Sequence, residues 1–157
     1  MLSSPKYEDR LDRLTEQLRL APALTADLIS NVVVDACRRL PVLNRAEEAT
    51  RRLDQLIEAG AWSDAALALI ELELPAWKLR RLVYEDGEWF CSLSKQPNLP
   101  VALDDTADAC HEVLPLAILS AFVEARRKTS AVREPSSPTV PQVRPTSGYA
   151  ICCDNFA

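Results

Sequence analysis

The sequence predicts an α+β fold that is mainly helical: four N-terminal helices, one β-hairpin, a C-terminal helix and a disordered tail. Two observations support this. Apolar residues recur at helical spacing through residues 7–74, and two apolar runs flank the pair Asp86-Gly87. From about Thr129 the composition becomes proline-rich. We therefore expect a single α+β domain over residues 1–128 and a disordered proline-rich tail over 129–157.

The first helix is predicted to begin at Ser4-Pro5 and to end before Pro22, because proline suits the first position of a helix and interrupts later positions. Its apolar side chains form one stripe, at Tyr7, Leu11, Leu14 and Leu18. The second helix is predicted to begin after the capping residue Thr25 and to end before Pro41. Its apolar residues cover a wide arc, so we expect it to be the central helix.

The third helix is predicted from Asn44 and Glu47, which have the spacing of a capping box. Gly60 lies where a left-handed C-terminal cap is expected. Ser63 is then predicted to cap the fourth helix. The last helix is predicted to start after Asp105 or Thr106 and to kink or restart at Pro115.

Asp86-Gly87 predicts a two-residue type I′ turn, since that turn needs two residues with positive φ. The resulting register pairs Tyr84 with Trp89 and puts alternate side chains on opposite faces. One face should pack on the helices; it consists of Leu82, Tyr84, Trp89, Cys91 and Leu93. The other is mixed and should meet water or a partner; it consists of Leu79, Arg81, Val83, Phe90, Ser92 and Ser94.

The overall charge argues against nucleic-acid binding as the main function. The net charge is −5 and the sequence pI is about 5.0, whereas a general nucleic-acid binder has a dominant basic footprint. The basic run Lys78, Arg80 and Arg81, beside several aromatics, leaves a weak nucleic-acid binder as an alternative. No apolar stretch has the length of a membrane span or the form of a secretory signal, so we expect a cytoplasmic protein with no membrane partner.

Candidate chemistry is sparse, and we assign no catalytic residue, metal site or cofactor. The sole histidine, His111, adjoins Cys110, and a pairing of His111 with the distant Cys91 leaves a Cys/His-dependent enzyme as an alternative. Possible reactive thiols are Cys110 and the adjacent pair Cys152 and Cys153 near the end of the chain. The odd number of cysteines, 5, does not suit a disulfide framework.

The favoured function is a non-enzymatic protein-interaction or regulatory module. The predicted partner-binding residues are Leu79, Arg81, Val83 and Phe90 on the mixed hairpin face, and addition of a partner strand to the sheet edge is a second predicted mode of binding. The proline-rich tail is a second predicted docking element. Self-association through the exposed strand edge is a milder form of the same prediction.

One part of the chain resembles a known group of proteins. The stretch GAWSDAALALIELELPAWKLRRLVYEDGEWFCSLSKQPNLP, continued by HEVLPLAILSAFVEARR, resembles short uncharacterised proteins of rhizobia and related alphaproteobacteria. The resemblance covers roughly Gly60 to Arg127. It implies a bacterial cytosolic origin and brings no known activity, cofactor or catalytic residue.

Overall fold

The computed structural model describes residues 5–40 and 47–132. Residues 133–157 of the predicted disordered tail, and Asn44, lie outside these residues. Within them the chain forms a mainly helical α+β fold, as predicted, with a three-stranded antiparallel sheet in the order β1-β2-β3. The elements in chain order are α1 (Pro5–Leu20), α2 (Ala26–Ala36), α3 (Glu48–Glu58), α4 (Trp62–Glu73), β1 (Lys78–Glu85), β2 (Glu88–Ser94), the short 3-10 helix η1 (Val101–Leu103), β3 (Ala107–His111) and α5 (Leu114–Val132).

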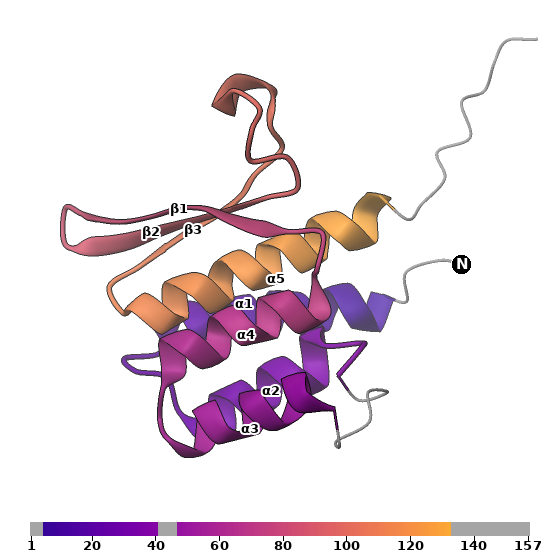
Figure 1. The fold of residues 1–157 in the computed structure, drawn as a ribbon, viewed down its shortest axis with the longest axis vertical. Helices are drawn as coiled ribbons and strands as arrows, with labels where there is room; N and C mark the ends of the chain where they lie inside the picture. Colours follow the sequence, from indigo (N-terminus) through magenta and orange to yellow (C-terminus); the bar gives the residue numbers. More distant parts are fainter. Residues whose placement is uncertain (1–4, 41–46, 133–157) are drawn as a thin grey trace, which may run out of the picture.

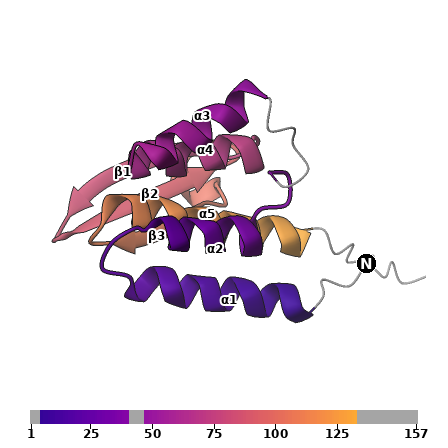
Figure 2. The same cartoon turned by 90° about the horizontal axis from the view of Figure 1, so that it is seen from below.

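The sheet lies on one side of a layer of helices, with α5 directly beneath it (Figure 1). Helices α1 and α4 flank α5, while α2 packs mainly on α1 and α3 on α4. Seen from below, α2 and α3 lie on the side of the helical layer that faces away from the sheet (Figure 2). The core therefore runs from the inner face of the sheet through α5 to the outer helices.

The central helix is α5, so the prediction that the second helix holds this position is wrong. Helix α5 packs against β2, β3, α1 and α4, and its side chains are buried nearly all round. Helix α2 leaves Val34 71% exposed. A helix that is apolar on every side belongs in the interior, and the run LPLAILSAFVEA in α5 has this composition.

The third strand is also a correction, because a helix was predicted to begin at Asp105 or Thr106. Residues 107–111 instead pair antiparallel with β2, Ala107 opposite Leu93 and His111 opposite Trp89. Residues 107–111 include no β-branched residue, so their β-strand propensity is low. Their extended conformation is instead determined by pairing with β2. Pro115 falls in the first turn of α5, where a proline needs no hydrogen-bond partner for its nitrogen.

The helix ends agree with the sequence in some places and not in others. Thr25 caps α2 as predicted, its hydroxyl accepting a hydrogen bond of 3.2 Å from the Leu28 amide. Gly60, at φ 68°, ends α3 as predicted, with the Ala61 amide donating to the Leu56 carbonyl in a Schellman motif. Ala61 is also the N-terminal capping position of α4, which begins at Trp62. Ser63 therefore lies inside the helix, and the prediction that it caps α4 is wrong.

The predicted capping box is not formed at the start of α3. That helix begins at Glu48, and Glu47 precedes it without a side-chain capping bond. In the predicted box, Glu47 would occupy the third helical position. The helix therefore starts later than the spacing of Asn44 and Glu47 suggests.

The hairpin has the predicted turn and register. Asp86 and Gly87 have φ values of 53° and 88°, and Tyr84 pairs with Trp89. Cys91 and Leu93 are fully buried against the helices, as expected. Tyr84 is 58% exposed, contrary to prediction, because the hairpin tip extends beyond α5 (Figure 1). Its ring packs beside that of Trp89, with the ring centres 5.2 Å apart.

A buried carboxylate joins three segments of the fold. Glu73, at the end of α4, accepts hydrogen bonds from the backbone amides of Arg38, Arg39 and Leu40, which follow α2, and from the guanidinium of Arg126 in α5. The side chains of Glu73 and Arg126 are 0% and 7% exposed. Three successive amides around one anion form a nest, so the chain after α2 is held to α4 and α5 by charge-assisted bonds.

The folded unit also extends past the predicted boundary at residue 128. Helix α5 continues to Val132. The Thr129 hydroxyl accepts a 3.1 Å hydrogen bond from the indole of Trp77, and Ser130 is buried. A truncation that preserves the domain should therefore keep residues 129–132.

Candidate interaction surfaces

Three of the four predicted partner-binding residues share the face of the sheet that points away from α5. Val83 and Phe90 lie opposite each other in the register and are partly buried. The Arg81 guanidinium lies 5.8 Å from the centre of the Phe90 ring and pairs with Glu85. This face thus presents an aromatic ring bordered by a cation.

Leu79 does not belong to that face. The register shifts between Leu79 and Arg81, so that Leu79 lies opposite Leu93 and Arg81 opposite Ser92. Directly paired residues project to the same side of a sheet, and Leu93 projects to the core. The irregularity at Arg80 therefore reverses the predicted face of Leu79, although Leu79 stays 42% exposed at the sheet edge.

Arg80 organises the segment between β2 and β3. Its guanidinium forms an ion pair with Asp104 at 2.5 Å and donates to the carbonyls of Pro97 and Leu99 at 3.1 and 2.8 Å. The Arg80 and Asp104 side chains are only 16% and 3% exposed. The Ser94 hydroxyl donates to the same Asp104 carboxylate at 2.6 Å. These bonds cover Ser94, which was predicted to face water, and hold both ends of the segment.

The held segment carries apolar side chains into solvent. It rises from the sheet on the side away from α5 (Figure 1). Leu99, Val101 and Leu103 are 36%, 70% and 73% exposed. Scattered exposed aliphatics are ordinary, but three within five residues on a protruding segment form a contiguous apolar feature of the kind found at interaction sites. We call residues 97–104 the apolar loop.

Among the described residues, the cysteine and histidine side chains lack the features of a thiolate–imidazole pair. Burial, with a smaller contribution from the charge of Asp108, raises the pKa of the Cys91 thiol to about 12, so it is protonated at neutral pH. The His111 Nδ1 accepts a 2.9 Å hydrogen bond from the Val113 amide. Cys110 is exposed, but neighbouring strand residues point to opposite faces, so it projects away from the His111 side.

The structure describes only one of the remaining thiols. Cys152 and Cys153 lie outside the described residues. Cys37 is buried, and burial together with the nearby Glu73 carboxylate raises its thiol pKa. Across residues 5–40 and 47–132, no three His, Cys, Asp or Glu side chains come together as metal ligands would.

One cation of the predicted basic run, Arg80, is used inside the fold. Arg80 is occupied by Asp104 and two carbonyls, and the ammonium of Lys95 lies 5.2 Å from the centre of the Trp77 ring. Arg81 pairs with Glu85 at 3.3 Å. Arg80 is therefore held inside the fold, whereas the Arg81 side chain stays 57% exposed and Lys78 is exposed as well.

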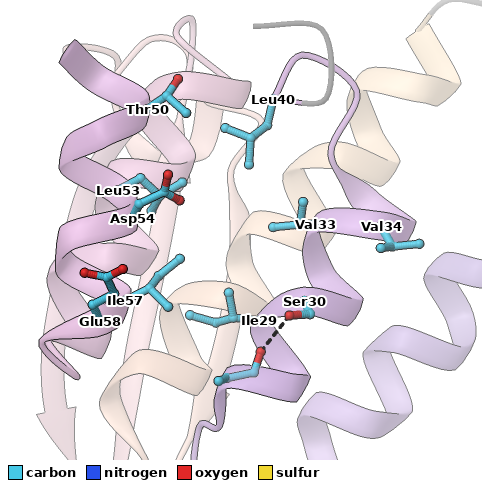
Figure 3. A pocket seen from close by; sticks show the side chains of 11 residues that line it. Ile29, Ser30, Val33, Val34, Leu40, Thr50, Leu53, Asp54, Ile57 and Glu58 are labelled. Atoms are coloured by element: carbon cyan, nitrogen blue, oxygen red, sulfur yellow. Dashed lines mark hydrogen bonds between the residues drawn. The ribbon is translucent and has the colours of Figure 1, made fainter. Parts of the chain in front are cut away.

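A second surface, which was not predicted, lies between α2 and α3. Because these two helices pack on different neighbours, they leave a groove of about 860 Å³ between them. Ile29 and Val33 of α2 point across it toward Leu53 and Ile57 of α3, and Leu40 lies at one end (Figure 3). The apolar spacing of both helices was visible in the sequence and predicts burial, and Ile29 and Leu53 are indeed only 5% and 2% exposed. No pattern in the sequence indicates that the same residues also border a groove.

Among the described helices, none combines the length and the apolar composition that a bilayer crossing requires. No protein-family model, no curated protein and no solved structure matches this chain.

Proposed function

We propose that this protein is a non-enzymatic protein-interaction or regulatory module of the bacterial cytoplasm. Its partner protein docks on the outer side of the sheet, over Arg81, Val83 and Phe90 and against the apolar loop. The supporting observation is the exposure of Leu99, Val101 and Leu103 on a segment that the buried Arg80–Asp104 pair holds in place. A segment that is already ordered loses little conformational entropy when it binds, so its apolar area contributes more fully to affinity.

Side-chain docking suits this surface better than the addition of a partner strand. Strand β1 is an edge strand, but its register is broken at Arg80 and its first half carries Lys78, Arg80 and Arg81. Bulges and charges are common devices against edge-to-edge pairing. The partner therefore makes its contacts through side chains on the outer face and the loop, and self-association by edge pairing is disfavoured.

The two alternative functions have weaker support. A Cys/His-dependent enzyme requires a thiolate near an available imidazole, whereas Cys91 is buried and protonated and Cys110 lies on the other face of its strand. A nucleic-acid binder requires unpaired cations, and Arg80 and Arg81 both have carboxylate partners.

Affinity capture from native lysate tests the proposal, with the full chain as bait and mass spectrometry as the readout. The double variant Val101→Asp/Leu103→Asp should lose a protein that the wild type retains. Leu20→Asp is the matched control, because Leu20 is a 64% exposed aliphatic residue at the end of α1, a helix that packs mainly on α5 and α2. Equal capture by all three baits, at equal folded content by circular dichroism, would refute the proposal.

A further inference from the structure

We infer that the groove between α2 and α3 is a second docking site, which takes an amphipathic helix with lysine or arginine along its polar edge. This site lies on the opposite side of the molecule from the sheet, so it does not depend on the function proposed for the apolar loop.

The shape of the groove suits a short helix. Each wall is a helix of 11 residues, and a rise of 1.5 Å per residue makes each wall about 16 Å long, or three turns. The lining residues recur at helical spacing, Ile29 and Val33 on one wall, Leu53 and Ile57 on the other. Two parallel apolar walls with a gap between them are the arrangement that receives the apolar face of an amphipathic helix.

The negative charge at the edge of the groove favours an occupant with cationic side chains beside its apolar face. Asp54 and Glu58 stand on the α3 wall, both exposed. None of the 11 described residues that line the groove is a lysine or an arginine. Cations on the flank of the bound helix would therefore meet carboxylates, which directs orientation and speeds association.

The other occupants fit less well. A second copy of this chain would bring the same two carboxylates to the groove, and like charges oppose each other there. Helix α1 of a second copy is also a poor occupant. In its described part, Leu20 is the one strongly exposed aliphatic side chain, so α1 has no apolar stripe left to place in the groove. The chain's own residues 135–145 contain prolines at four positions, and proline is the residue type least suited to the interior of a docked helix.

A designed peptide provides the test. The probe is a fluorescein-labelled peptide of roughly 14 residues, near the length at which an isolated helix becomes marginally stable, with leucine along one face and lysine at the other positions. The control peptide replaces every lysine by glutamate. Fluorescence anisotropy with the full chain should show the lysine peptide binding at least about tenfold more tightly than the glutamate peptide.

Variants of the groove make the result specific. Asp54→Lys/Glu58→Lys should reverse the preference between the two peptides, and both positions are exposed, so the fold should survive. Ile57→Asp should abolish binding, while Leu20→Asp and Val101→Asp/Leu103→Asp should leave it unchanged. Added salt should weaken the lysine peptide's binding, since exposed charges are screened.

Three outcomes would overturn the inference. The first is equal binding of both peptides, or an unchanged preference after charge reversal. The second is a dimer in sedimentation equilibrium that Ile57→Asp dissociates, which would assign the groove to a second copy. The third is displacement of the probe by a synthetic peptide of residues 146–157, which would assign it to the chain's own terminus.

Discussion

Replacing Glu73 by glutamine should destabilise the fold more than any other single polar substitution among the described residues. Both carboxylate oxygens face only donors: Oε2 accepts from Arg38, Arg39 and Arg126, and Oε1 accepts from Arg39 and Leu40. Glutamine has one acceptor and one NH₂ donor, so its donor end would oppose backbone amides. It would also leave the Arg126 guanidinium buried without a counter-charge.

The expected loss is about 3–5 kcal/mol, the usual cost of removing one member of a buried ion pair. This is a large part of the roughly 5–15 kcal/mol that stabilises a domain. Arg126→Met should cost less, about 1–3 kcal/mol, because the carboxylate would keep its three backbone donors. Glu73→Gln is therefore expected to lose more unfolding free energy than Arg126→Met. This difference arises from the three backbone amides that bind the carboxylate, because in an isolated ion pair the two losses would be similar.

Urea unfolding followed by the fluorescence of the 3 tryptophans measures both losses. Glu73→Gln should lower the urea midpoint by about 2 M, at an unchanged slope. The control is Glu16→Gln, which removes one member of the exposed Glu16–Arg19 pair and should leave the midpoint unchanged. If Arg126→Met proves as costly as Glu73→Gln, or Glu73→Gln shifts nothing, the role given to the backbone nest is wrong.

Four further predictions concern the hairpin, the thiols and the apolar loop. Gly87→Ala should cost about 1–2 kcal/mol in urea unfolding, since Gly87 has φ 88° and an added Cβ meets no heavy atom within 4 Å; an unchanged midpoint would contradict this. Iodoacetamide near neutral pH should alkylate Cys110 in the folded protein and Cys91 only after unfolding, as mapped by mass spectrometry. Because folding raises the pKa of Cys91 to about 12, its contribution to stability is complete below about pH 8.5 and declines as pH rises toward 12. The unfolding free energy should therefore fall less steeply with pH above 8.5 in Cys91→Ala, and identical slopes would exclude this. Arg80→Met should speed amide exchange in the apolar loop about tenfold or more and leave β2 unaffected, whereas uniform exchange would show that Arg80 does not hold the loop.

Features that depend on neighbours in the chain were predictable. The stripe of α1, the cap at Thr25, the left-handed residue at Gly60 and the turn at Asp86-Gly87 all appear where the sequence places them. Each rests on a local constraint: helical periodicity, a hydroxyl within reach of an amide, or a backbone conformation with positive φ. The α+β class followed from these elements alone.

Features that depend on distant partners were not predictable. Strand β3 has little intrinsic preference and forms because β2 offers an unpaired edge, while Leu79 changes face because one extra residue enters at Arg80. The groove between α2 and α3 exists because α2 packs mainly on α1 and α3 on α4. An apolar stripe does not indicate which neighbouring helix it will contact. Periodicity determines which side of an element is buried, and only packing determines what that side meets.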